Sequence, residues 1–364
     1  MTVRYGLIGS GMMGQEHIGN IALLDGAEIV AVADPDEGMR AAAARQAGDV
    51  VVYADYRELL SADICDAYII ASPNDTHHAV MVDTLASDKP ILCEKPLCTT
   101  LADCRDLVAR AARSRSLVWV AMEYRFMPSA QRLIRETAAG TAGSPKMVAI
   151  REHRYPFLDK VDDWNRFNRR TGGTLVEKCC HYWDLMRLLL GSDPIRVYAS
   201  AGIANNHLDE QYGGETPDII DHGFVIVDFE NGTRGMLDLC MFADGSAWQE
   251  VISVTGPKAR IDACLPAPLR FSPDGEARAA CIVVSDRATK TEHVETIPVD
   301  EALLRAGDHH GSTYFQHEKF RDLVRTGHGR PEVTLDDGLW AVHVGEAAER
   351  SAESGQAITL DKEA

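Results

Sequence analysis

The first 120 residues alternate between short apolar runs and longer stretches with helical periodicity. Apolar runs of four to seven residues, each followed by an amphipathic stretch, are typical of strands followed by helices. Such alternation predicts β–α–β units in a parallel sheet that is covered on both faces. The predicted strands cover 3–8, 28–33, 50–53, 67–71, 90–93 and 117–121, and the predicted helices cover 12–24, 36–47, 55–61, 76–87 and 100–114.

The pattern changes after residue 122, where longer β-rich segments are separated by few helices. Turn signals such as Asn231-Gly232 join several of them, which favours a mostly antiparallel sheet with one open face. We therefore predict an α/β domain over 1–122 and an α+β domain with a large open sheet over 123–358. The predicted strands of this second domain cover 146–154, 195–201, 223–229, 232–241, 250–255 and 259–263, and its helices cover 127–139, 176–190, 313–326 and 336–354.

Composition narrows the class of protein. The 55 acidic and 37 basic residues give a net charge of −18, which repels nucleic acids and anionic membrane surfaces. No apolar run reaches 18 residues, and the first residues lack the pattern of a signal peptide. The nine cysteines show no C-x-x-C spacing, which favours reduced thiols. We expect a cytoplasmic protein that binds neither nucleic acid nor membrane.

A glycine-rich turn follows the first predicted strand. Gly9-Ser10-Gly11-Met12-Met13-Gly14 has the G-x-G-x-x-G pattern and opens a helix. The first glycine permits the tight turn, the second lets a pyrophosphate approach the backbone, and the third lets helix and strand pack closely. The unpaired N–H groups at the helix N-terminus favour an anion there. A glycine-rich turn without a ligand is the competing interpretation.

An acidic residue closes the second predicted strand. Asp34 lies 20 residues after Gly14, where a carboxylate can accept both ribose hydroxyls of NAD and repels a 2′-phosphate. Asp36 adds to that repulsion, whereas Arg40, one turn into the next helix, is able to bind a phosphate. The sequence thus predicts an NAD-binding Rossmann domain, with NADP as the less favoured cofactor.

Two further motifs follow the fourth and fifth predicted strands, at the edge of a parallel sheet where ligands bind. The first comprises Ser72, Pro73, Asn74, Asp75, Thr76 and His77, and the second comprises Glu94, Lys95 and Pro96. We expect Ser72, Pro73, Asn74, His77, Glu94 and Lys95 to border the cofactor. A solvated surface lysine is the alternative for Lys95.

The order of these motifs resembles the Gfo/Idh/MocA oxidoreductases, and the resemblance extends through the chain. Gly172-Gly173, followed by Leu175, Glu177, His181 and Asp184, is similar to the family's G-G-x-L-x-D-x-G-x-H-x-x-D segment. The closing segment with Val333-Thr334, Asp337-Gly338, Ser351 and Gly355 also resembles the family pattern. The resemblance implies an NAD-dependent dehydrogenase acting on a sugar or cyclitol hydroxyl.

The resemblance also implies a catalytic set. In the family the E-K-P lysine, here Lys95, contacts the reacting hydroxyl, and the helix histidine, here His181, accepts its proton. The family's acid, here Glu177, lies one turn earlier, on the same helix face as His181. A histidine suits proton removal near neutral pH, and an ammonium stabilises a developing alkoxide. Glu177 in place of Asp and Cys179 in place of Gly depart from the pattern, so Glu177 either reaches the substrate directly or meets Lys178.

Substrate contacts are expected from the second domain. Trp164 between Asp163 and Asn165 offers an aromatic platform with hydrogen-bonding groups, although a tryptophan packed in a loop is an equal alternative. The predicted substrate-binding residues are Lys95, Tyr124, Arg125, Arg154, Asp163, Trp164, Asn165, His181 and His310. Asp184 either lines the site or pairs with a base. No Cys or carboxylate residue lies at metal-ligand spacing from His309-His310, so we predict no metal site.

Three functions compete at this point. The first is a dehydrogenase that exchanges NAD(P) and oxidises a sugar, a sugar derivative or inositol. The second is an enzyme of the same fold that retains NAD and cleaves glycosides through transient oxidation. The third is a non-catalytic dinucleotide sensor, which has no need of Lys95 or His181. The resemblance further implies a homodimer or homotetramer formed through the open sheet.

Overall fold

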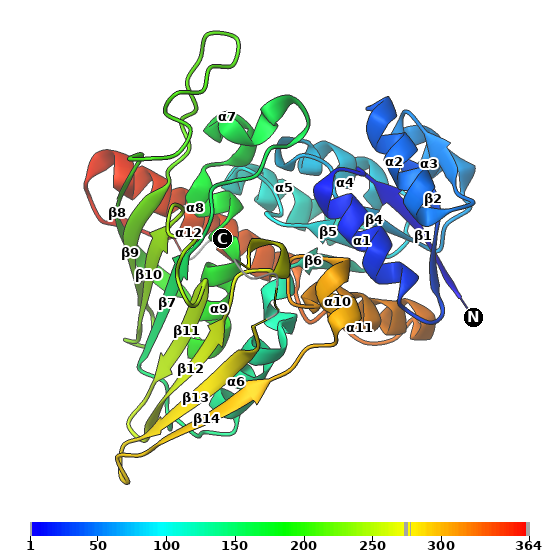
Figure 1. Ribbon diagram of the computed structural model, residues 1–364. Coiled ribbons are helices and arrows are strands. Elements are labelled where there is room, and N and C mark those ends of the chain that lie inside the picture. Colours follow the sequence, from blue (N-terminus) through cyan, green and yellow to red (C-terminus); the bar gives the residue numbers. More distant parts are fainter. Residues whose placement is uncertain (1, 273–275, 277, 362–364) are drawn as a thin grey trace.

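The computed structural model describes residues 2–272, 276 and 278–361, and its first sheet is a parallel one (Figure 1). This sheet has six strands in the order β3-β2-β1-β4-β5-β6, which is the Rossmann order and confirms the predicted fold. Its strands are β1 (Val3–Ile8), β2 (Ala27–Ala33), β3 (Val51–Tyr53), β4 (Ala67–Ile70), β5 (Ile91–Glu94) and β6 (Val118–Ala121).

Burial explains why these runs form strands. Every residue of β4, β5 and β6 is buried, as expected where helices cover both faces of a parallel sheet. Capping side chains fix where helices begin: Asp36 accepts a hydrogen bond from Met39 N (2.8 Å), and Thr100 accepts one from Asp103 N (3.2 Å). The connecting helices are α1 (Met12–Ala22), α2 (Glu37–Ala47), α3 (Tyr56–Ala62), α4 (His77–Leu85) and α5 (Leu101–Ala111).

The second sheet is mixed and mostly antiparallel, with the order β14-β13-β12-β11-β7-β10-β9-β8-β15. Strand β10 runs parallel to β7, and the other neighbouring strands of this sheet pair antiparallel within the described residues. Helices α6 (Pro128–Ala138), α9 (Cys180–Leu190) and α12 (Leu335–Ser354) pack against it. Its strands are β7 (Met147–His153), β8 (Pro194–Gly202), β9 (His222–Phe229), β10 (Arg234–Cys240), β11 (Glu250–Thr255), β12 (Ala259–Leu265), β13 (Ala280–Asp286), β14 (Glu292–Ile297) and β15 (Ile358–Thr359).

The C-terminal part of the chain returns to the Rossmann sheet. Helix α11 (Ser312–Thr326) packs against α1, β1 and the short turn η2 (Glu123–Phe126), and α10 (Glu301–Ala306) also contacts α1 (Figure 1). Helix α12 contacts both α5 and the second sheet. These helices bring groups from residues near 300 to the carboxyl edge of the Rossmann strands.

Some elements differ from the prediction. The expected helix over 176–190 is divided into α8 (Thr174–Glu177) and α9, while β13, β14, β15 and α10 were not predicted. Cys179 N donates to Thr174 O at 3.3 Å, five residues back, so the turn between α8 and α9 is wider than an α-helical turn. The remaining short elements are α7 (Asn168–Thr171), η1 (Asn74–Thr76), η3 (Val161–Arg166) and η4 (Leu269–Phe271).

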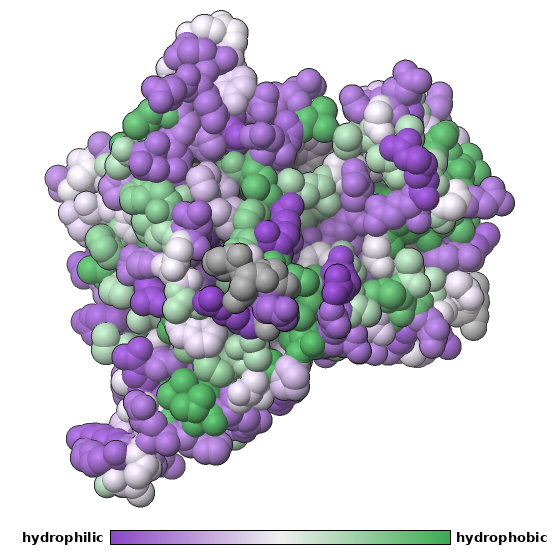
Figure 2. All heavy atoms as spheres, in the orientation of Figure 1, coloured by the Kyte–Doolittle hydropathy of each residue, from purple (hydrophilic) through white to green (hydrophobic). Residues whose placement is uncertain are grey.

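The surface is mainly hydrophilic on the face shown in Figure 2, with hydrophobic residues in separate small groups. A long connection between β8 and β9 projects from the body of the molecule (Figure 1). Within the described ranges, none of the helices combines the length and the apolarity that a membrane crossing requires.

Candidate active site

The glycine turn packs tightly against the end of β4. Gly9 has φ +89°, and a Cβ atom added there would lie 2.5 Å from Ser72 N. A Cβ atom at Gly14 would lie 2.4 Å from Gly9 O. Both positions therefore require glycine, the first for its backbone conformation and both for their close contacts.

Gly11 is different, because a Cβ atom built on it meets no heavy atom within 4 Å. It caps α1 without a side chain, so the first N–H groups of the helix, at Met12 and Met13, face this space without a side-chain cap. An open backbone surface at a helix N-terminus suits a pyrophosphate. The residues present thus fit a dinucleotide, which Ser10 to Met13 would hold.

Asp34 lies beside the glycine turn, at the end of β2. Its Oδ2 accepts hydrogen bonds from Ser10 N (2.7 Å) and Ser10 Oγ (3.1 Å), and its Oδ1 accepts one from Asp36 N (2.9 Å). The side chain of Arg40 donates to the backbone oxygens of Asp34 (2.7 Å) and Pro35 (2.8 Å). The carboxylate of Asp34 therefore stands where the sequence expects a ribose acceptor, and Arg40 is engaged by carbonyl groups.

The loops after β4 and β5 are joined by His77. Its Nδ1 lies 2.8 Å from Pro96 O, its Nε2 lies 2.9 Å from Ser72 O, and the residue is fully buried. These contacts join the two loops through His77, and the cofactor contact expected for it stays a prediction. Pro73 caps η1, and the Nδ2 atom of Asn74 is buried without a hydrogen-bond partner among the described residues, so Asn74 keeps a donor for a ligand.

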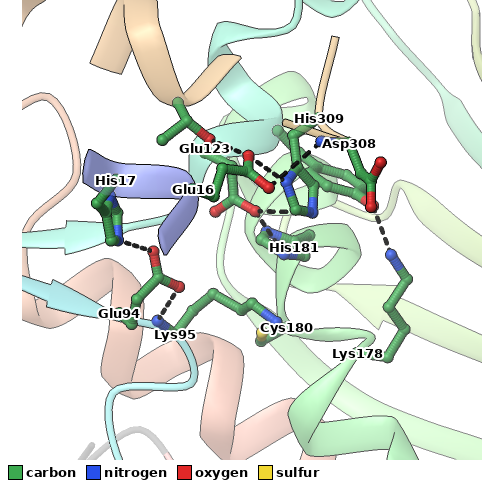
Figure 3. A network of polar contacts seen from close by, with 12 residues as sticks. Glu16, His17, Glu94, Lys95, Glu123, Lys178, Cys180, His181, Asp308 and His309 are labelled. Atoms are coloured by element: carbon green, nitrogen blue, oxygen red, sulfur yellow. Dashed lines mark hydrogen bonds and ion pairs between the residues drawn. The ribbon is translucent and has the colours of Figure 1, made fainter. Parts of the chain in front are cut away.

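Lys95 extends from the end of β5 toward Cys180 and His181 (Figure 3). Its Nζ donates to Glu177 O at 3.3 Å, and its backbone N–H donates to Glu94 Oε2 at 3.2 Å. Burial opposes the charge of this ammonium, but the surrounding acidic groups, Cys180 and Glu123 first among them, more than offset it and raise the pKa of Lys95. Lys95 is therefore a half-buried cation at neutral pH.

His181 projects from the first turn of α9 and is 1% exposed. The ring of Tyr124 stacks on it with centroids 4.0 Å apart and an interplanar angle of 6°. Burial, together with the charges of Lys95 and Lys178, lowers the pKa of His181 well below its ordinary value. The imidazole is therefore neutral at physiological pH and able to accept a proton.

Glu123 places a carboxylate between two histidines. Its Oε1 lies 3.5 Å from His181 Nε2 and 3.8 Å from His309 Nε2 (Figure 3). Burial, with the nearby Glu94 carboxylate, raises the pKa of Glu123 to about 7, although His309 and Lys95 oppose this rise. On the other side of the ring, His309 Nδ1 lies 2.8 Å from Glu16 Oε1. Burial opposes the charge of His309, but Glu16 raises its pKa to about 9.

Glu177 faces a lysine and not the histidine. Its Oε1 accepts a hydrogen bond from Lys160 Nζ at 3.3 Å, and that ammonium lies 4.3 Å from the centroid of the Trp164 ring. Lys178, the alternative partner expected for Glu177, instead lies 3.0 Å from Glu152 Oε1 and also contacts the hydroxyl of Tyr124. Burial lowers the pKa of both lysines.

Three predicted substrate residues have structural contacts. Arg125 pairs with Asp184 (Nε to Oδ2, 2.6 Å) and also donates to Glu332 O at 2.6 Å, which settles Asp184 as the partner of a base. The amide of Asn165 is fully buried and donates to Leu158 O at 3.0 Å. His310 has φ +53° and directs its Nε2 to Pro266 O at 3.0 Å, so its neighbour His309 is the one that meets the cluster.

Two other predicted substrate-binding residues lie near the border of the cluster. Arg154 lies 3.4 Å from Glu152 Oε1 and 4.3 Å from the centroid of the Tyr155 ring, and its charge contributes to the low pKa of His181. Asp163 is half-buried at a positive φ of 46°, and its N–H donates to Lys160 O at 2.9 Å.

Sequence reasoning missed several residues of this cluster, namely Glu16, Glu123, Lys160, Lys178 as a site residue, and His309. One signal was available for Glu123, because it directly follows β6 at the carboxyl edge of a parallel sheet. Within the described part of the chain, no group of three or more His, Cys, Asp or Glu side chains is arranged to hold a metal ion.

Comparison with protein families agrees with this architecture. Residues 3–122 match the model described as oxidoreductase family, NAD-binding Rossmann fold, and residues 137–360 match the C-terminal alpha/beta domain of the same family. Among curated proteins, inositol 2-dehydrogenase 1 of Saccharopolyspora erythraea is 37% identical over 203 residues, which is 54% of this chain and 57% of that protein. This alignment therefore spans little more than half of that relative's length.

A second relative aligns along nearly its whole length. Myo-inositol 2-dehydrogenase of Thermotoga maritima is 26% identical over 375 aligned positions, covering 99% of each chain. Among solved structures, a levoglucosan dehydrogenase in complex with NADH and levoglucosan superposes with a TM-score of 0.83 at 18% identity over the full length of both chains, which shows the shared fold. Because the two family matches span most of the sequence, the chain belongs to the Gfo/Idh/MocA oxidoreductase family, with its NAD-binding Rossmann domain and its C-terminal α/β domain.

Proposed function

We propose that the protein oxidises a secondary hydroxyl of a sugar, a sugar derivative or inositol to a ketone, or an anomeric hydroxyl to a lactone, with NAD. The observation that carries this proposal is that Lys95 lies near His181, whose pKa its charge lowers, beside the carboxyl edge of the Rossmann sheet (Figure 3). Relatives named inositol 2-dehydrogenase support a polyol substrate. Buried charged and hydroxyl groups around these two residues also favour a ligand with many hydroxyls.

The proposed chemistry divides between two side chains. NAD, when bound, supplies the acceptor for the hydride. His181, neutral and buried, accepts the hydroxyl proton at an imidazole nitrogen. Lys95, charged and half-buried, stabilises the negative charge that develops on the substrate oxygen.

The substrate site is proposed to extend from these residues toward the loop that precedes α7. Lys160 bridges Glu177 and Trp164 there, so the aromatic platform expected at Trp164 is joined to the cluster through one ammonium group. Tyr124 stacks on one face of His181, and the substrate is proposed to reach a nitrogen at the edge of the ring. Arg154 and Asp163 are proposed to border this site.

NAD is the proposed cofactor in preference to NADP. Asp34 and Asp36 place two carboxyl groups at the end of β2, where a 2′-phosphate would meet negative charge. Arg40 is held by two backbone oxygens in this neighbourhood and would have to leave them to bind a phosphate. A cytoplasmic location stays a prediction.

A substrate panel tests the function. Purified protein incubated at alkaline pH with inositols, aldoses, sugar derivatives and anhydrosugars is expected to reduce NAD with at least one member, and NADP more slowly, as measured by absorbance of the reduced cofactor. Inclusion of aryl glycosides tests the alternative chemistry. Cleavage of glycoside without net NADH would replace this proposal, and no turnover with any compound and either cofactor would contradict it.

The open face of the second sheet is proposed to form the interface of a homodimer or homotetramer. Its outward-facing residues include large apolar side chains that are neighbours across three strands, with Tyr198 opposite Ile226 and Ile226 opposite Met236. These side chains and Phe224 are 40 to 61% exposed. A contiguous apolar patch on an antiparallel sheet is typical of a subunit interface.

Charge placed on this patch should separate the subunits. We expect the double variant Phe224→Asp/Ile226→Asp to shift the assembly to a smaller species, because carboxylates would lose hydration in an apolar interface. Light scattering coupled to size exclusion measures the mass. Exposed Val294→Asp on β14 is the control, with 59% exposure outside the patch, and should leave the mass unchanged. A monomeric wild-type protein would refute the proposed interface.

A further inference from the structure

The carboxylate of Glu123 lies beside His181 and His309, and no sequence motif predicted this position. It comes from the turn after β6, whereas His181 belongs to α9 and His309 to the segment before α11. The side chains of Glu123 and His181 are each 1% exposed, while that of His309 is 22% exposed. Among the described residues, neither carboxylate oxygen of Glu123 has a hydrogen-bond partner. It is thus a buried acid without hydrogen bonds, close to the predicted base.

Glu177 does not stand in this relation to His181. Its carboxylate accepts from Lys160, and its backbone oxygen contacts Lys95 and the thiol of Cys180, each at 3.3 Å. The wide turn between α8 and α9 also separates it from His181, so the two residues do not share one regular helix. The position that the family resemblance assigned to the acid is therefore engaged elsewhere.

We propose that Glu123 is the acid partner of His181 and receives a proton from its Nε2 when the imidazole takes up, at its other nitrogen, the proton that the substrate hydroxyl releases. This inference rests on the proposed function. Glu123 acts through the imidazole, so it is a positioning and proton-accepting residue and not a direct contact of the substrate.

The proton balance is simple. The O–H bond of the substrate breaks as an N–H bond forms at Nδ1 of His181, a buried nitrogen without a hydrogen-bond partner among the described residues, and the imidazole becomes a cation. That cation is costly in a buried site that already holds Lys95 and Lys178. Transfer of the Nε2 proton to Oε1 of Glu123 restores the neutral imidazole and converts the carboxylate to a neutral acid. The two electrons of the C–H bond leave as hydride in the proposed oxidation and take no part in this transfer.

The charges that face Glu123 suit this role. Glu94 on β5 favours the protonated acid, whereas Lys95 and His309 favour the carboxylate, and Glu16 on α1 holds His309 charged. Because the pKa of Glu123 is about 7, its side chain is protonated below that pH and then cannot accept a proton from His181. We therefore expect kcat/KM to fall as the pH decreases through about 7.

Paired variants test the assignment. Glu123→Gln keeps the shape of the side chain but removes the carboxylate that accepts the proton. It should lower kcat about 10- to 100-fold at neutral pH and change KM little. It should also abolish the acidic limb of the pH profile. Glu123→Asp should restore part of kcat. Glu177→Gln, at another buried glutamate of the cluster, should keep the acidic limb. Loss of that limb in Glu177→Gln, with its retention in Glu123→Gln, would overturn the proposal.

A spectroscopic measurement separates this inference from the proposed function. The difference infrared spectrum between wild type and Glu123→Gln should contain a protonated-carboxyl band that titrates near neutral pH, and its absence would overturn the role of Glu123. This measurement needs no turnover. If the wild type oxidises no compound of the panel, the proposed function fails while the infrared result still decides whether Glu123 can hold the proton.

Discussion

Replacement of Lys95 by Ala is expected to lower kcat by about 10²- to 10³-fold, the usual effect of removing one preorganised group that stabilises a developing oxyanion. The ammonium belongs to a half-buried residue and donates to Glu177 O at 3.3 Å, so it is already positioned before the reaction. Water that enters the space left by alanine offers a weaker and mobile dipole. The loss should fall mainly on kcat, because the charge on the substrate oxygen exists only as the reaction proceeds.

Steady-state kinetics with the best substrate of the panel measures this effect, and titration of protein fluorescence with NAD measures cofactor binding, which should persist. Lys89→Ala is the matched control: Lys89 precedes the same strand, β5, at its opposite end and contacts Asp63 and Cys65 O. It should retain wild-type kcat. Wild-type turnover in Lys95→Ala would remove the lysine from the proposed site.

The Rossmann domain was predictable because its strands are buried on both faces. Strands such as β4 and β5 read as continuous apolar runs, and each ends in a motif whose position at the sheet edge follows from parallel topology. The predicted bounds of the six strands agree with the structure to within a residue. Burial of this kind leaves a strong local signal in the sequence.

Edge strands and wide turns leave a weaker signal. Strand β14 lies at the edge of its sheet with four of its six residues exposed, so its polar sequence lacks an apolar periodicity. The break between α8 and α9 occurs at Lys178 and Cys179, without Pro or Gly, and only the hydrogen bonds of the folded chain reveal it. Spacing alone therefore placed Glu177 and His181 on one helix face incorrectly.

In the candidate site, too, some residues were predictable from a local motif and others were not. Lys95 and His181 each carry a local motif, but their acidic and basic neighbours come from distant elements: Glu16 from α1, Glu123 after β6, and His309 before α11. Long-range packing brings these groups together, and no spacing along the chain encodes it. The choice between His309 and His310 depends on the left-handed backbone of His310, which directs the two rings to different partners.

Replacement of Asp184 by Ala is expected to destabilise the protein by about 3 kcal/mol, because it leaves the guanidinium of Arg125 buried without its main partner. The side chains of Arg125 and Asp184 are only 10% and 1% exposed, and they join the turn after β6 to α9. Losses on breaking such buried pairs run to about 5 kcal/mol. The lower value is expected here, because Asp337 Oδ1 also lies 3.2 Å from the same guanidinium.

Urea unfolding followed by circular dichroism measures the change, with Asp193→Ala as the matched control. Asp193 accepts from Arg187 at 2.6 Å, but its side chain is 44% exposed, so its loss should cost less than about 1 kcal/mol. The double variant Arg125→Met/Asp184→Leu removes both charges and should recover most of the stability, because an apolar pair needs no hydration. A double variant no more stable than Asp184→Ala would show that the loss comes from disturbed packing around α9 and not from an unpaired buried charge.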